Sequence, residues 1–169
     1  MTLCSMAIKI NVAQKDQEVI NHTLERIGYP YQKRKFHCTI GFIEKTIPIE
    51  QAHSFGERIR KDLQEYLEVE PLLYEVDKAL PLFGRVLAFL PTNRSQEHLK
   101  KVNLWLFHRV QEVSENQWGL NKETLPENYT PHLTFWHTHR PDHRLKKLEE
   151  FATTHPIYHL LNTGYVIFN

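Results

Sequence analysis

The sequence predicts an α+β protein that forms one bilobed domain over residues 1–169. Short segments alternate apolar and polar residues, a pattern typical of half-buried strands. Longer segments between them carry apolar residues at helical spacing. The order of strands and helices in the first half of the chain is nearly repeated in the second, and no linker separates the halves. We therefore expect two similar α+β units that share one core.

The first half is expected to hold three strands and two helices. The first helix ends at Gly28 and Pro30, and the second begins at Pro48 and stops before Pro71, because glycine and proline interrupt helices. The expected elements are strand 6–13, helix 16–27, strand 36–43, a helix of about 18 residues from Pro48, and strand 72–79.

The second half is expected to hold four strands and two helices. Residues 83–90 form a nearly continuous apolar run, which favours a strand. Residues 115–128 are polar and contain Gly119 and Pro126, which favours a long loop. The expected elements are strand 83–90, helix 95–113, strand 131–136, helix 142–151 and two closing strands, 157–161 and 165–168.

The composition is that of an ordinary globular protein, with 41% hydrophobic and 24% charged residues and a net charge of +1. The two cysteines, Cys4 and Cys38, have neither a disulfide framework nor a zinc-ligand spacing. The sequence shows no signal peptide and no apolar run long enough to cross a membrane. We therefore expect a soluble, cytoplasmic monomer that has no membrane partner.

Two of the expected strands carry the same polar pattern. One residue separates His37 from Thr39, and the same spacing joins His132 to Thr134. Because side chains alternate along a strand, each histidine shares a face with its threonine. The residues between and after them are expected to face the core: Cys38, Ile40, Leu133 and Phe135.

These residue types suit the hydrolysis of a phosphodiester. Histidine titrates near neutrality, so His37 and His132 can act as complementary base and acid across one phosphate. The hydroxyls of Thr39 and Thr134 can donate hydrogen bonds to its non-bridging oxygens. We therefore predict a metal-independent phosphodiesterase with no cofactor, in which the two histidines are catalytic and the two threonines bind the phosphate.

The pattern resembles the 2H phosphoesterase superfamily, which includes RNA 2′,3′-cyclic phosphodiesterases (historically named 2′-5′ RNA ligases) and 2′,5′-oligoadenylate phosphodiesterases. The likeness rests on both motifs, on the apolar strand 85–90 (RVLAFL) and on residues 129–135 (YTPHLTF). It implies two lobes of antiparallel sheet with outer helices and both motifs in a central cleft. The implied substrate is a 2′,3′-cyclic phosphate on RNA ends or small nucleotides, with a 2′,5′-linked oligoadenylate as the alternative.

Three further residues are candidate substrate contacts. Lys35 shares strand parity with His37 if the extended segment begins early, and Tyr129 and Trp136 offer rings on which a base can stack. Bacterial members of the superfamily often have Ala-Arg where this chain has Trp136 and His137. The basic phosphate contact is therefore missing, moved to Arg140, or replaced by histidine.

Three alternatives stay open at this point. A metal site is conceivable in the cluster of His132, His137, His139, Asp142 and His143, although by strand parity His137 and His139 are expected to point away from the cleft. Cys38 can be considered as a nucleophile, but the same parity turns it away from His37. The chain can also be a non-catalytic module that binds a nucleotide or RNA in the same cleft.

Overall fold

The computed structural model describes residues 1–137, 143–154 and 157–169. Their strands and α-helices follow the order β1 (Leu3–Val12), α1 (Gln14–Ile27), β2 (His37–Pro48), α2 (Ile49–Val69), β3 (Leu72–Leu82), β4 (Val86–Pro91), α3 (Asn93–Val113), β5 (Leu133–Trp136), α4 (Arg144–Thr154) and β6 (Ile157–Phe168). A short 3-10 helix, η1 (Lys122–Thr124), lies within the segment expected to be a loop. Every strand pair is antiparallel, so the α+β prediction is confirmed.

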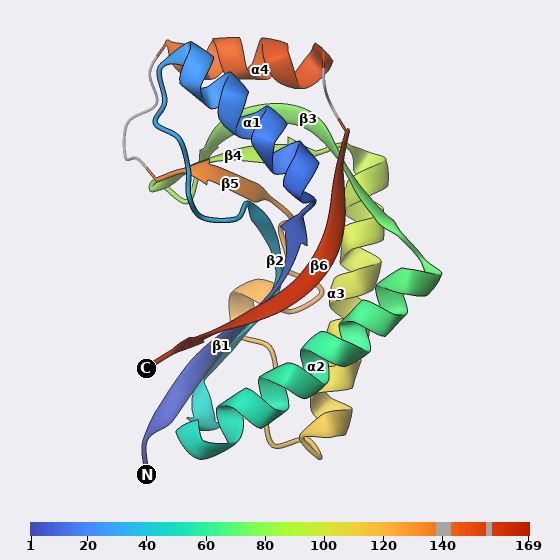
Figure 1. Ribbon diagram of the computed structural model, residues 1–169. Helices are drawn as coiled ribbons and strands as arrows, with labels where there is room; N and C mark the ends of the chain where they lie inside the picture. Colours follow the sequence, from blue (N-terminus) through green and yellow to red (C-terminus); the bar gives the residue numbers. More distant parts are fainter. Residues whose placement is uncertain (138–142, 155–156) are drawn as a thin grey trace.

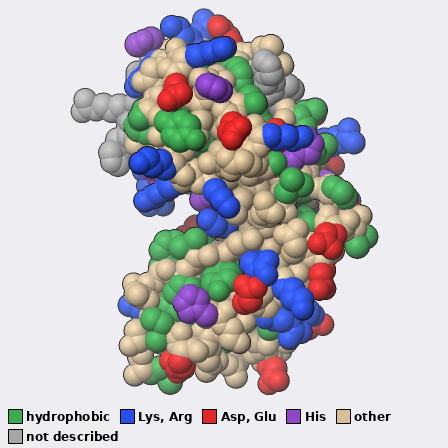
Figure 2. Space-filling model, in the orientation of Figure 1, with side chains coloured by type: hydrophobic (Ala, Val, Ile, Leu, Met, Phe, Trp, Pro, Cys, Tyr) green, Lys and Arg blue, Asp and Glu red, His purple; other side chains and the backbone are tan. Residues whose placement is uncertain are grey.

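The strands follow one another in a closed ring, β1-β2-β5-β4-β3-β6. Long ladders join β1 to β2 and to β6, and these three strands form one lobe. Strands β3, β4 and β5 form the other. The ring closes where Cys38 pairs with Leu133 and where the first residues of β3 and β6 pair. The molecule is therefore bilobed, and its surface is hollowed between the lobes on the side where β2 begins and β5 runs (Figures 1 and 2).

The element order had led us to expect that the lobes would correspond to the two halves of the sequence. They do not. Strand β6 pairs with β1, and helix α1 lies beside α4 above β3 (Figure 1). The two closing strands predicted at 157–161 and 165–168 are one strand. The prediction of a break was wrong because Asn162, Thr163 and Gly164 pair with β1, which holds the glycine extended.

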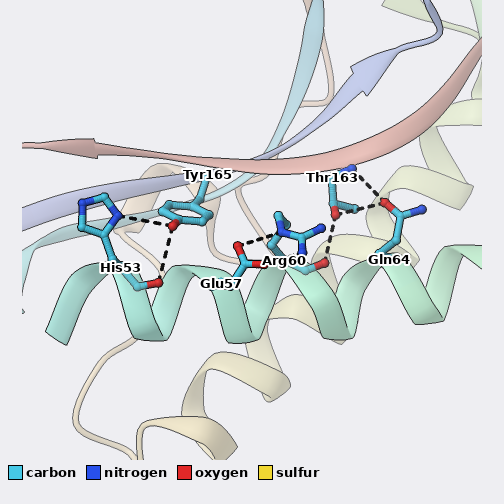
Figure 3. A network of polar contacts seen from close by, with 6 residues as sticks. All are labelled: His53, Glu57, Arg60, Gln64, Thr163 and Tyr165. Carbon is cyan, nitrogen blue, oxygen red and sulfur yellow. Dashed lines mark hydrogen bonds and ion pairs between the residues drawn. The ribbon is translucent and has the colours of Figure 1, made fainter.

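Helix α2 packs along β6 through an apolar stripe and a row of polar contacts (Figure 3). Gly56 lies under the Tyr165 ring so closely that a Cβ there would come 2.6 Å from Tyr165 Cδ2. The Thr163 backbone N–H donates to Gln64 Oε1 at 3.1 Å, and Thr163 Oγ1 lies 2.9 Å from Arg60 O. This packing holds β6, the strand that pairs with β1, against α2. The described helices include none with the length and apolar character needed to span a bilayer.

Candidate active site

The two motifs meet where β2 and β5 pair. Cys38 is opposite Leu133, and extending this antiparallel register by one residue each way sets His37 beside Thr134 and Thr39 beside His132. The buried side chains on the core face of these strands are Cys38, Ile40, Leu133 and Phe135. His37, Thr39, His132 and Thr134 alternate with them and are partly exposed. Each histidine therefore lies next to the threonine of the other motif.

Both imidazoles are held in the same way. Nδ1 of His37 lies 3.2 Å from Lys35 O, and Nδ1 of His132 lies 2.9 Å from Thr130 O. A carbonyl oxygen only accepts hydrogen bonds, so the hydrogen of each neutral ring is on Nδ1. Nε2 of each ring then carries the lone pair that can accept a proton. The same Nδ1–carbonyl hydrogen bond thus selects the same tautomer in His37 and His132.

Burial lowers the pKa of both histidines below the usual value of 6.5. The hydrogen bond to Lys35 O raises the pKa of His37, while the charges of Lys9, His132 and His137 lower it further. For His132, the hydrogen bond to Thr130 O opposes the effect of burial. The positive charge of His132, when protonated, is one of the causes that lower the pKa of His37, so the neutral form of both rings is favoured in the empty site.

Tyr129 lies beneath the site rather than in it. It is 5% exposed, its hydroxyl donates to Thr39 O at 2.7 Å, and Cys38 Sγ lies 3.7 Å from the Tyr129 hydroxyl oxygen. The prediction that Tyr129 contacts substrate does not fit this placement, because its ring is enclosed by the core. Its hydroxyl instead ties the segment before His132 to β2.

Cys38 is fully buried, and burial raises the pKa of its thiol to about 11. A thiol in this environment stays protonated and has no access to a substrate. The structure thus disfavours the cysteine nucleophile on both burial and charge.

The other two candidate contacts differ in exposure. Trp136 is half-buried, and its ring lies 6.0 Å from that of Tyr29, so part of it serves packing between β5 and the end of α1. Lys35 is exposed and contributes the carbonyl that orients His37. The position of Arg140, considered as a replacement phosphate contact, lies outside the described residues.

Two residues near the motifs went unrecognised in the sequence. Lys9 on β1 is the direct cross-strand partner of Thr39. Phe83 is 60% exposed, and its ring centroid is 5.4 Å from that of His132. It had been assigned to a strand, but it forms a tight turn with Gly84, and both have positive φ angles of 54° and 66°. The position of Lys9 beside Thr39 follows from the cross-strand register, and the position of Phe83 beside His132 follows from the turn. Neither can be read from the local sequence.

The metal alternative involves residues that the structure describes only in part. His139 and Asp142 of the proposed cluster lie outside the described residues. Within the described ranges, no three His, Cys, Asp or Glu side chains are grouped so as to hold a metal ion. His137 was expected to point away from the cleft, and its charge lowers the pKa of His37. Strand β5 ends at Trp136, so strand alternation does not extend to residue 137.

Comparisons with known proteins find similarity at the level of structure. No family model matches the chain, and no curated protein matches it. Among solved structures, it is similar to Kluyveromyces marxianus Usb1 with uridine monophosphate, at 13% sequence identity and a TM-score of 0.46. The match covers 99% of this chain and 98% of that chain. At this level of similarity, the assignment of function depends on the site itself.

Proposed function

We propose that this chain is a phosphodiesterase that hydrolyses a 2′,3′-cyclic phosphate on RNA ends or small nucleotides. The observation that carries the proposal is the pair of imidazoles on adjacent strands, each with Nδ1 bonded to a carbonyl and Nε2 available. Each is beside a threonine hydroxyl of the other motif. The four side chains supply a base, an acid and two hydrogen-bond donors around one phosphate.

The proposed reaction is an in-line displacement. Nε2 of one neutral histidine takes a proton from water as the water oxygen bonds to phosphorus. The bond from phosphorus to one ribose oxygen breaks, and the other histidine, protonated at Nε2, gives its proton to that oxygen. Thr39 and Thr134 donate hydrogen bonds to the non-bridging oxygens, where negative charge is concentrated. The product is a ribose with one free hydroxyl and one phosphate monoester.

Phe83 supports a nucleotide as the substrate. Its exposed ring is next to His132 on a turn whose two positive φ angles hold it out from the sheet. An exposed aromatic face beside a phosphate site suits a nucleobase, because every base can stack on it. We propose that Phe83 receives the base of the nucleotide whose phosphate is cleaved.

The activity is tested with a panel of uridine and adenosine 2′,3′-cyclic phosphates and 2′,5′-linked oligoadenylate, with products identified by chromatography. We expect hydrolysis of the cyclic phosphates to survive prolonged dialysis against a strong chelator, because the four motif side chains already supply each step. Metal content is measured in parallel. Loss of turnover that zinc or manganese restores would contradict the mechanism, and binding of the panel without turnover would identify a non-catalytic module.

The dependence of rate on pH provides a second test. The active form has one neutral and one protonated histidine, so kcat/KM should be bell-shaped. Both histidines have a lowered pKa, and the charged groups acting on His37 are all basic: Lys9, His132 and His137. We therefore expect the optimum below pH 6.5, measured on a cyclic phosphate that does not titrate in this range. A rate that rises steadily into alkaline solution would contradict the two-histidine mechanism, and a bell-shaped profile with its optimum above neutrality would contradict the lowered pKa values.

A further inference from the structure

Lys9 shares the face of the sheet that carries the first motif. On the ladder between β1 and β2, Lys9 is opposite Thr39 and Asn11 is opposite His37. Directly opposite residues of antiparallel strands project to the same face. The intervening pair, Ile10 and Cys38, is fully buried, which places Lys9 on the cleft side. The strand order β6-β1-β2-β5 sets Lys9 on the flank of the motifs that is away from His132.

Glycine at position 164 leaves room for the Lys9 side chain. Gly164 on β6 is the other cross-strand partner of Lys9. A Cβ at Gly164 would lie 3.3 Å from Lys9 Cε and 3.7 Å from its Cγ, so the lysine stem leans over β6. Its ammonium group is then one to two strand spacings from Thr39, roughly 5–10 Å. This places the charge of Lys9 beside the group formed by the two motif histidines and the two motif threonines, rather than within it.

Lys9 interacts electrostatically with other basic side chains. Burial and the charge of Lys35 lower the pKa of Lys9, and Lys9 in turn lowers the pKa of His37. No carboxylate forms an ion pair with Lys9 or Lys35 in the described part of the chain. Lys9 and Lys35 thus supply positive charge that is not neutralised by an ion pair with a described carboxylate, which suits the binding of an anion. Figure 2 shows basic side chains beside the hollow between the lobes.

We propose that Lys9, with Lys35, binds a second phosphate of the substrate, one nucleotide away from the phosphate held between His37 and His132. This inference rests on the proposed function and narrows it. The distance from the centre suits the neighbouring phosphate of a ribonucleotide chain, which lies across one ribose from the cyclic phosphate. The preferred substrate is then an oligonucleotide end, or a nucleotide with a 5′-phosphate, rather than a cyclic mononucleotide with a single phosphate.

Two substrates that differ by one phosphate test this directly. They are uridine 2′,3′-cyclic phosphate and the same molecule with an added 5′-phosphate. We expect the protein to prefer the second by about tenfold in kcat/KM at low salt, and the preference to shrink as salt rises. Lys9→Met should reduce this preference to about threefold or less. The matched control is Lys45→Met, which removes an exposed lysine from the same sheet, on β2, beyond the motif.

Two further measurements separate a binding role from a structural one. Lys9→Met removes a charge that lowers the pKa of His37, so its pH profile should shift to higher pH. Gly164→Ala keeps the lysine but places a Cβ 3.3 Å from Lys9 Cε, so the stem must shift and the preference should fall by less than in Lys9→Met. Equal kcat/KM for the two substrates, or an unchanged preference in folded Lys9→Met or Lys9→Gln, would overturn the proposal.

Binding without turnover keeps this inference distinct from the proposed function. Calorimetric titration compares uridine 3′,5′-bisphosphate with uridine 3′-monophosphate on the unmodified chain and on Lys9→Met. Tighter binding of the bisphosphate that Lys9→Met abolishes supports the second phosphate site even if no substrate is cleaved. Failure to cleave any cyclic or 2′,5′-linked substrate would instead count against the proposed function alone.

Discussion

Replacing either motif histidine with alanine is expected to lower kcat/KM by about 10²- to 10⁴-fold while the protein stays folded. In the proposed mechanism each ring supplies a proton-transfer step, and neither ring is part of the buried core. Within the described part of the chain, each ring hydrogen-bonds through Nδ1 to a local carbonyl, and losing such a bond costs about 1 kcal/mol of folding free energy. Activity is measured on uridine 2′,3′-cyclic phosphate, and folding is followed by circular dichroism and thermal melting.

A matched control for these variants is His108→Ala, which removes an exposed imidazole from α3 and should retain full activity. Near-normal turnover by His37→Ala would show that the two motifs do not work together. A phosphodiester with a nitrophenol leaving group separates the two roles. Because that group departs without a proton, the variant that lacks the general acid should lose much less activity on it than the variant that lacks the base.

Replacing Thr39 or Thr134 with valine is expected to lower kcat by about 10²- to 10³-fold with little change in KM. Valine keeps the branched shape and removes only the hydroxyl, so the strand and the bond from Tyr129 to Thr39 O should persist. The loss should appear in kcat if the hydroxyls contact oxygens whose charge grows in the transition state.

Serine at the same two positions is the informative control, because it keeps a hydroxyl on a smaller side chain. Thr39→Ser and Thr134→Ser should regain most of the activity lost in the valine variants. If the serine and valine variants were equally impaired, the threonines would act through packing rather than through a hydrogen bond to phosphate.

Local sequence patterns were enough to predict most of the elements and the alternation of buried and partly exposed residues in the two motif strands. The alternation of His37 and Thr39 with Cys38 and Ile40 is a property of one strand, and the burial of these residues follows it. Such patterns do not specify which strands become neighbours. The division into sequence halves failed for this reason, because β6 pairs with β1 at the opposite end of the chain.

The missed residues depend on pairing between distant segments. Lys9 reads as an ordinary polar position of an alternating strand until β1 is set beside β2. Tyr129 has a polar tip that suits a surface or a core equally well, and its burial is decided by acceptor and packing partners about 90 positions away. Phe83 continues an apolar run in the sequence, and the left-handed backbone at Phe83 and Gly84 turns it out of the strand.

Strand β6 connects the two lobes, because it pairs with β1 of one lobe and with β3 of the other. Leu160 pairs with Val12 of one lobe and with Leu72 of the other, so the two ladders meet at a single residue. Spreading the lobes apart would break backbone hydrogen bonds on both sides of it, and no loop at this point can act as a hinge. The strand pairing therefore opposes changes in the width of the hollow. We expect a ligand to bind there with little rearrangement of the lobes, so that its affinity depends on how well its size matches that width.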